Sequence, residues 1–419
     1  MEPITLFISA AQTIWQAIGP VWFLILPPLF YFVFKSIWMK YITDEHWTEK
    51  KYIVLEIIPP RDLEKSPRIM ESFFFALAGI IKSPNMIEEY YEGHFFPFIS
   101  LELVGTEGTA HFYIWLPENM RSLIESQLYA QYSDIEIFQV EDYVNQLPPV
   151  LPNKEWTLWG TDVKLVREDP YPIRTYKYFE EDVTGKMLDP LSSLVETVGK
   201  TGPGEHLWLQ IIIQPQHESW YEEGLALVQD IAGRTKKRKG VFSEIGKDLM
   251  DVFSGVLKGL FSPVEFERKE EKDEQPLEFR LTPGEKDTLK AVENNISKNI
   301  FLTKMRFLYI GRREVFDKIF VSSFFGGLKQ FNDQQLNNFA PDNRSKTYAN
   351  YIWKDFRLAF RQRRIYRRYR NRFPTGVKFM LSTEELASIY HMPDMSVVAP
   401  SMQRIDARRS GAPANLPVE

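Results

Sequence analysis

An arginine-rich segment is the strongest candidate for binding chemistry in this chain. Between residues 356 and 373 the sequence reads FRLAFRQRRIYRRYRNRF, in which arginines alternate with aromatic residues. Guanidinium groups bind phosphates through paired hydrogen bonds, and aromatic rings stack on bases or lie at a lipid interface. Nucleic acid, anionic lipid and an acidic protein partner are all candidate ligands, because an arginine run does not distinguish them. The predicted binding residues are Arg357, Arg361, Arg363, Arg364, Arg367, Arg368, Arg370 and Arg372, with Phe356, Phe360, Tyr366 and Tyr369 interleaved among them.

A second candidate is an amphipathic stretch between residues 240 and 263. Apolar residues recur there at helical spacing, and a basic tetrad at residues 236–239 precedes them. The charged linker that follows, at residues 267–275, has nothing apolar to bury. Such a helix either lies on a membrane surface, which the basic tetrad favours, or docks on a partner, and ordinary packing on its own domain is the alternative. The predicted interfacial residues are Phe242, Ile245, Leu249, Phe253 and Leu260.

Patterns typical of catalysis and metal binding are missing from the sequence. Residues 198–201 (VGKT) resemble the end of a phosphate-binding loop, but Val195 occupies a position where that loop requires glycine. The six histidines include no i, i+4 pair, and the absence of cysteine excludes disulfides, thiolate nucleophiles and cysteine-ligated metals. We therefore expect no enzyme activity, no cofactor and no metal.

The composition indicates a folded chain of more than one domain. Its 419 residues are 44% hydrophobic, which is enough to bury sizeable cores. The formal net charge is only −5, so the chain has no global basic field that would attract nucleic acid. Any binding of polyanions must therefore come from a local patch.

The amino-terminal segment predicts a membrane anchor over residues 1–45. No charged residue occurs between Pro3 and Phe34, and residues 17–34 are apolar over about the length that crosses a bilayer. A cleaved signal would carry basic residues before its apolar core, whereas only Glu2 precedes this one. Lysines follow at positions 35, 40, 50 and 51, and this excess places that side in the cytoplasm. We expect a single-pass protein of the bacterial cytoplasmic membrane with its N-terminus outside, the alternative being a buried core helix.

Alternating strand and helix patterns predict an α+β protein whose first soluble domain covers residues 46–150. The order is strand, helix, two hairpin-linked strands, helix and strand, which is the ferredoxin-like arrangement β-α-β-β-α-β. A proline-rich connector at residues 146–152 ends the domain. The predicted strands cover residues 52–58, 95–104, 109–116 and 134–140.

A second ferredoxin-like domain is predicted over residues 151–395, with the same order and a long insertion. The insertion occupies residues 233–281, and the arginine-rich segment forms a basic helix within residues 350–373. Capping boxes at residues 282–285 and 382–385 mark two helix starts. The predicted strands cover residues 156–166, 206–214, 300–310 and 377–381, and an extended tail covers residues 396–419.

Several segments carry a resemblance to a known family. They are HFYIWLPENMRSLIESQLYAQYSDIEIFQVEDY (111–143), LWGTDVKLV (158–166), DPLSSLVE (189–196), the stretch from LTPGEK to YIGRREVF (281–316), FFGGLKQF (324–331) and LSTEELASIYHMP (381–393). Together they resemble the N-terminal region of membrane-bound bacterial proteins related to type IV secretion and conjugative-transfer coupling ATPases. In those relatives a segment resembling PANLPVE (413–419) leads into a motor domain, whereas this sequence stops at Glu419.

The resemblance implies a non-catalytic, membrane-anchored component of a DNA or protein transfer machine. Such a component would be either encoded separately from its motor or truncated before it. In the first case it would work with a separate motor ATPase of the coupling-protein type, and DNA and further copies of the chain are the other candidate partners. The alternative is a membrane-tethered module that binds nucleic acid or anionic lipid and is unrelated to secretion. A third reading is an enzyme whose arginines hold a phosphorylated substrate.

Overall fold

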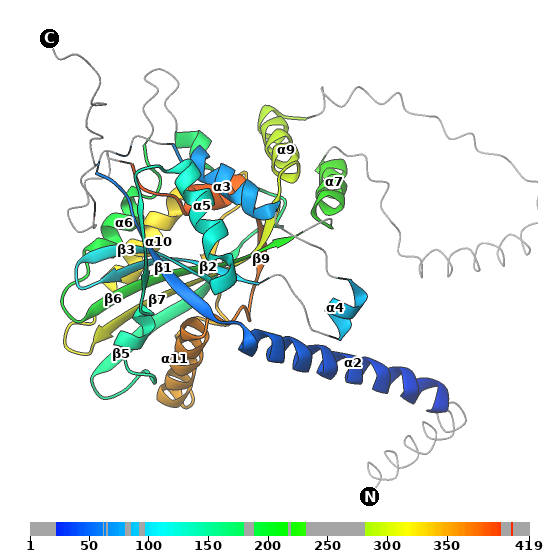
Figure 1. Ribbon diagram of the computed structural model, residues 1–419, viewed down its shortest axis with the longest axis horizontal. Helices are drawn as coiled ribbons and strands as arrows, with labels where there is room; N and C mark the ends of the chain where they lie inside the picture. Colours follow the sequence, from blue (N-terminus) through cyan, green and yellow to red (C-terminus); the bar gives the residue numbers. More distant parts are fainter. Residues whose placement is uncertain are drawn as a thin grey trace, which may run out of the picture.

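The fold is known from a computed structural model that describes residues 22–394, apart from gaps at 62, 64–65, 80–84, 92–96, 180–187, 217–218 and 232–280, together with Arg404. The described part confirms the predicted α+β class. Its centre is one antiparallel sheet of nine strands, with helices on both faces (Figure 1).

The first half of the chain contributes four strands to this sheet, in the spatial order β4-β1-β3-β2. All three neighbouring pairs are antiparallel. The elements are α2 (Trp22–Glu49), β1 (Tyr52–Ile58), α3 (Arg68–Ala78), α4 (Met86–Tyr90), β2 (Ile99–Thr106), β3 (Thr109–Pro117), α5 (Arg121–Gln131) and β4 (Glu136–Val140).

The second half continues the sheet in the order β6-β7-β5-β8, and β9 pairs with the first residues of β7. The elements are β5 (Trp156–Leu165), α6 (Ser192–Gly199), β6 (Glu205–Gln216), α7 (Ser219–Ile231), α9 (Pro283–Ile296), β7 (Ile300–Arg312), α10 (Ile319–Leu328), β8 (Phe339–Pro341), α11 (Lys354–Arg370), β9 (Phe379–Ser382) and α12 (Thr383–Ile389).

One detail of strand pairing differs from the sequence prediction. The predicted last strand of the second unit forms β9, whereas the edge position beside β5 is taken by β8, which the sequence did not indicate. A strand of three residues that ends in Pro341 is too short to show a period of two, and its pairing partner is distant in the sequence.

The two halves share the sheet through the pairing of β2 with β6. This antiparallel ladder runs from Ile99 opposite Ile213 to Thr106 opposite His206. Both strands are buried along nearly their whole length, because helices cover each face of the sheet there. The boundary predicted near residue 150 is therefore a connector between two parts of one continuous sheet.

The two faces of the sheet are covered differently. Helices α3, α5, α6, α10 and α12 pack on one face and enclose the larger apolar core, in which Phe73, Leu194 and Phe324 are buried. Helix α11 covers the other face (Figure 1), and the second, smaller core there also includes Tyr143. Side chains alternate along each strand, so β7 sends Phe307 into the first layer and its neighbours into the second.

The amino-terminal helix α2 extends away from the sheet and runs almost directly into β1 (Figure 1). Large apolar side chains along it are exposed, among them Phe32 and Ile37. Among the described residues, no helix combines the length and the apolar character needed to cross a bilayer. The predicted span begins at Ala17, before the first described residue. The amphipathic stretch with Phe242, Ile245, Leu249, Phe253 and Leu260 and the predicted tail, apart from Arg404, also lie outside the described residues.

The packing of β2 against α6 can be tested by adding a side chain at Gly105, where the two elements approach closely. We expect Gly105→Ala to lower the free energy of unfolding by roughly 1–3 kcal/mol, as overpacking of a tight contact does. The reason is that a Cβ at residue 105 would lie 2.3 Å from the backbone carbonyl oxygen of Val198. The measurement is urea-induced unfolding of the full chain.

Gly326→Ala on α10 is the matched control. A Cβ there meets no atom within 4 Å, so the gain in helix propensity should stabilise the protein by about 0.5–1 kcal/mol. Equal stability changes in the two variants would contradict the close approach of α6 to β2.

Candidate functional site

The arginine-rich segment forms helix α11, and one side of this helix belongs to the protein core. Gln362, Ile365, Tyr366 and Tyr369 are buried against the sheet. The amide of Gln362 donates to the carbonyl of Leu158 at 2.6 Å, and the hydroxyl of Tyr366 donates to the carbonyl of Pro148 at 2.9 Å. Tyr366 and Tyr369 are therefore not available to stack on a ligand, which corrects the sequence interpretation.

A second side of α11 is an exposed stripe of aromatic and cationic residues. Phe356, Phe360, Arg363 and Arg367 follow one another at intervals of four, three and four residues, which places them on one helix face. Phe356 is 73% exposed and Phe360 is 57% exposed. The guanidinium groups of Arg363 and Arg367 make no hydrogen bond or ion pair with any residue that the structure describes. This stripe, called the aromatic–arginine stripe below, faces solvent with its charge unneutralised.

A third side of α11 carries arginines that are held by backbone carbonyls. Nη1 of Arg357 donates to the carbonyl of Asn350 at 3.1 Å, and Nη2 of Arg364 donates to the carbonyl of Arg344 at 3.2 Å. Arg361 donates to two carbonyls in the same loop. Carbonyls are neutral, and within the described part of the chain no carboxylate pairs with these three cations. Their positions are fixed while their charge is retained.

These two sides border a pocket of about 350 Å³. The guanidinium of Arg364 lies 5.8 Å from the centre of the Phe360 ring, so cation and aromatic surface adjoin. Such a lining can hold an anionic group on the arginines and a flat apolar group on the rings. The lining residues are Arg344, Phe356, Arg357, Phe360, Arg361 and Arg364.

The carboxyl-terminal end of the arginine segment has a structural role instead. Arg370 donates to the carbonyl of Leu147 at 3.2 Å and to Oδ1 of Asn145 at 2.8 Å. Arg372 is buried and does not face solvent. Arg370 and Arg372 are therefore removed from the set of eight predicted binding arginines. The sequence pattern could not show this, because the burial of Arg372 depends on contacts far away in the sequence.

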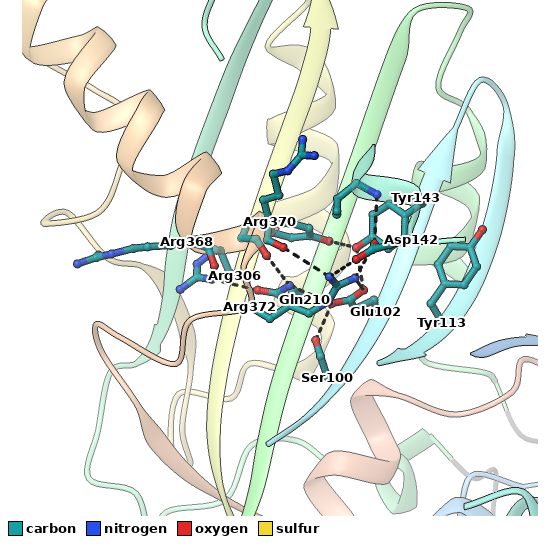
Figure 2. A network of polar contacts seen from close by, with 12 residues as sticks. Ser100, Glu102, Tyr113, Asp142, Tyr143, Gln210, Arg306, Arg368, Arg370 and Arg372 are labelled. Carbon is teal, nitrogen blue, oxygen red and sulfur yellow. Dashed lines mark hydrogen bonds and ion pairs between the residues drawn. The ribbon is translucent and has the colours of Figure 1, made fainter. Parts of the chain in front are cut away.

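Arg372 forms a buried ion cluster with Glu102 and Asp142. Its Nε and Nη2 donate to both oxygens of Glu102 at 2.9 and 3.0 Å, and its two Nη atoms donate to Asp142 at 2.6 and 2.9 Å. Arg372 has a φ of 50°, a left-handed conformation that costs energy for a residue with a side chain. The four hydrogen bonds hold it there (Figure 2).

The Arg372 cluster continues as a row of polar residues across the sheet. Asp162, Arg306, Gln210 and Glu102 lie directly opposite one another on β5, β7, β6 and β2. Nε of Arg306 donates to Asp162 at 3.0 Å, its Nη1 donates to Gln210 at 3.0 Å, and the Gln210 amide donates to Glu102 at 2.9 Å. Lys304 pairs with the second oxygen of Asp162 at 2.8 Å. Figure 2 shows Arg306, Gln210 and Glu102 of this buried row near the end of α11.

The buried row also caps the carboxyl-terminal end of α11. Arg306 donates to the carbonyl of Arg368 at 2.9 Å, and Gln210 donates to the carbonyl of Tyr369 at 3.2 Å. The last carbonyls of a helix have no partner within the helix, and a cation near them is favourable. The side chain of Arg368 itself points away from the row (Figure 2). The sheet thus holds the helix through its backbone and leaves that arginine side chain outside.

The charges in the row are balanced. Lys304, Arg306 and Arg372 face Asp162, Glu102 and Asp142. Burial, followed by the nearby Glu102 carboxylate, raises the pKa of Tyr143 well above its usual range. Its hydroxyl therefore stays protonated and donates to Glu102 at 2.9 Å.

Burial opposes the charged form of Arg372, but Glu102 and Asp142 outweigh it and raise the pKa of Arg372 further. Burial lowers the pKa of Lys304 to about 8 although Asp162 opposes the shift. Each buried charge of the row therefore has a partner of opposite sign within hydrogen-bonding distance.

The residues of this row were not predicted from the sequence. Glu102, Asp162, Lys304 and Arg306 are charged residues inside otherwise apolar strands. The sequence did offer one signal, a charged residue at a strand position that the alternation places in the interior. Charged residues are seldom buried without a partner, so such a position indicates a buried ion pair. The partners themselves could not be paired without the strand order.

Two other features resemble ligand sites, a pocket beside α3 and the VGKT sequence, but their lysines form ion pairs within the protein. A pocket of about 700 Å³ beside α3 contains Lys177 and Lys298, which are paired with Glu384 and Glu71. Lys200 of the VGKT sequence ends α6 and pairs with Glu196, whereas a phosphate-binding lysine lies at the start of a helix. In the described part of the chain, no group of three histidine or acidic residues is placed to hold a metal ion.

Comparison with known proteins identifies one matching family model, described as a domain of unknown function (DUF8128). It matches residues 95–404, which begin just before β2 and extend beyond α12. The match includes α11 and the whole buried row, and leaves out α2 and β1. No curated protein matches the chain.

The Arg372 cluster should be essential for stability. We expect Arg372→Met to lower the free energy of unfolding by roughly 3–5 kcal/mol, because Glu102 would keep a buried charge without its cation. Replacing both partners, as Glu102→Gln with Arg372→Met, should recover part of this loss, since the buried carboxylate is then neutral. Urea unfolding of the three proteins measures both effects.

Arg121→Met is the matched control, because Arg121 pairs with Glu125 at the surface of α5. A surface pair of this kind contributes at most about 1 kcal/mol. Similar losses for Arg372→Met and Arg121→Met would show that the buried row does not support the fold.

Proposed function

The chain belongs to the DUF8128 family of domains of unknown function, and we propose that it is a membrane-anchored, non-catalytic protein that binds nucleic-acid phosphates through α11. The observation that carries this proposal is the aromatic–arginine stripe with its adjoining pocket. Arg363 and Arg367 carry free positive charge beside exposed rings, on a helix whose backbone is fixed to the sheet.

The mixture of residues in the pocket favours nucleic acid over the other two candidate ligands. Arginines supply phosphate contacts, and Phe356 and Phe360 supply surfaces on which bases can stack. An anionic membrane needs only a field of positive charge, and an acidic protein needs no stacking surface. Because the net charge of the whole chain is −5, the chain as a whole does not attract a polyanion, and only a local positive patch such as the stripe would do so.

The proposed anchor combines residues 17–34 with the first part of α2. Its support is the uncharged, apolar sequence up to Phe34, followed by lysines and by Trp38 and Tyr41, which are residue types common at membrane interfaces. The exposed apolar side chains of α2 need a cover, and lipid provides one. In this arrangement the sheet domain and α11 are in the bacterial cytoplasm.

We further propose that each half of the sheet is a ferredoxin-like unit and that the protein serves a DNA or protein transfer machine. The strand orders β4-β1-β3-β2 and β6-β7-β5-β8 are those that two such units would have. The link to secretion rests on the sequence resemblance, with a separate motor ATPase as partner. A coupling ATPase encoded next to this protein would support it, and the alternative is a nucleic-acid or lipid binding module outside secretion.

Membrane orientation can be tested with reporter fusions. A reporter attached after Glu419 should be active only in the cytoplasm, because the lysines at positions 35, 40, 50 and 51 lie on that side of the span. Activity of the fusion in the periplasm would reverse the proposed orientation.

Binding through the stripe can be tested with Arg363→Gln/Arg367→Gln. Each lost phosphate contact should flatten the slope of log affinity against log salt by about 0.7 to 0.9, so the double variant should lose roughly 1.5. The fold should be unaffected, since both side chains are exposed. The measurement is a titration of fluorescent single- and double-stranded DNA at several salt concentrations.

The matched control is Lys286→Gln/Lys290→Gln, which removes the same charge from exposed positions on α9. Its salt slope should equal that of the unaltered protein. Competition with anionic vesicles in the same assay ranks lipid against DNA. If the unaltered protein shows no salt-dependent binding of DNA even near about 50 mM salt, where phosphate contacts are weakly screened, nucleic acid is not the ligand.

A further inference from the structure

We propose that α4 is a second membrane contact, a short helix that inserts apolar side chains into the lipid interface beside α2. This inference rests on the membrane anchor proposed above. It concerns a different element, one outside both the predicted span and the region matched by the family model.

Two contacts fix α4 against α2 at a defined position along the helix axis, close to the end of the predicted span. The indole Nε1 of Trp38 donates to the carbonyl of Tyr90 at 2.9 Å, and Nζ of Lys35 lies 4.8 Å from the centre of the Tyr90 ring. Lys35 and Trp38 are within about one helical turn of Phe34, where the predicted span ends. Lysine and tryptophan at this position are typical of the interface between lipid and water. Helix α4 therefore lies at the level of the lipid headgroups.

The fold of α4 does not come from packing in the core. Oδ1 of Asn85 accepts hydrogen bonds from the amides of Ile87 and Glu88 at 2.9 Å, and Glu88 accepts from the amide of Asn85 at 2.8 Å. This capping box starts the helix. A helix of five residues is not stable by itself in water, so the contacts with α2 are needed as well.

The side chains that α4 presents are large, apolar and uncovered. Met86 is 78% exposed, Ile87 is 66% exposed and the adjoining Tyr91 is 75% exposed. On α2, Phe34 and Ile37 are exposed to a similar degree. Figure 1 shows α4 beside α2 and separate from the helices that cover the sheet. The apolar surface of the anchor thus continues laterally onto a second element.

Lipid fits the exposed surface of α4 better than a protein partner does, because of where this surface lies along α2 and because of the charge that α4 carries. The surface adjoins the end of the predicted span, where the lipid interface is the nearest apolar medium. Helix α4 carries the acidic Glu88 and Glu89 and no basic residue, so anionic headgroups would not attract it. The contact should therefore depend on apolar insertion, about 5–10 Å deep, and not on salt or on anionic lipid.

A second contact beside the anchor would restrict rotation of the sheet domain about α2. One helix alone leaves the domain free to turn about the membrane normal and to tilt. With α4 also held in the interface, the sheet and α11 would keep one inclination to the membrane.

The absence of cysteine allows a direct test in the full chain, reconstituted in phosphatidylcholine vesicles. A single cysteine introduced as Ile87→Cys or Met86→Cys is labelled with an environment-sensitive fluorophore. We expect a blue shift, a several-fold rise in intensity on reconstitution, and quenching by brominated lipid. Added salt should change none of these.

Two further labelled positions separate the possible outcomes. Phe32→Cys lies within the predicted span. Ile319→Cys is a matched control with 61% exposure on α10, a helix that lies away from α2 (Figure 1). Quenching at residues 87 and 32 but not at 319 is the expected result.

Quenching at 32 alone would overturn the role of α4 and leave the anchor intact. An aqueous environment at both 32 and 87 would overturn the anchor as well. A blue shift at 87 without quenching by lipid would indicate a protein partner and would also overturn the inference.

Discussion

The pairing of Arg372 with Glu102 and Asp142 is the interaction on which most of this structure depends. Glu102 lies on β2, so it belongs to the first half of the chain, whereas Arg372 follows α11 in the second half. Glu102 also accepts from Gln210, which connects it to Arg306 and Asp162. Each charge in this row is buried only because its neighbour is present, since an unpaired ion in the interior is strongly unfavourable. The row therefore fixes the two halves of the sheet and the end of α11 in one arrangement.

This constraint explains how one helix can be both a core element and a binding surface. The buried side of α11 and its capped carboxyl terminus fix the position of its axis. Its other sides can then carry arginines that are not consumed by internal ion pairs. A surface held in place before the ligand arrives loses less conformational freedom on binding, which favours affinity. The structural ion pairs and the proposed ligand contacts thus use the same residue type at different ends of one segment.

The amino-terminal part of the protein follows a different physical rule. On α2 and α4 the large apolar side chains face outward, and polar contacts such as that between Trp38 and Tyr90 join the two helices. In the sheet domain, large apolar side chains form the cores on the two faces of the sheet, although some, such as Phe356 and Phe360 of α11, are exposed. These two patterns are the basis of the proposed anchor, in which lipid would cover α2 and α4 and water would surround the sheet domain.

Local features of the sequence determined the α+β class, most strands, and helix starts such as the capping boxes of Thr282 with Glu285 and Ser382 with Glu385. These depend on residues a few positions apart, so periodicity and capping patterns report them. The arginine segment was likewise visible as a helix. Only the tertiary structure decided that β2 pairs with β6, that β8 forms an edge, and that Tyr369 and Arg372 are buried. Those outcomes depend on partners more than a hundred residues away, such as Glu102 for Arg372, and a local pattern carries no information about distant partners.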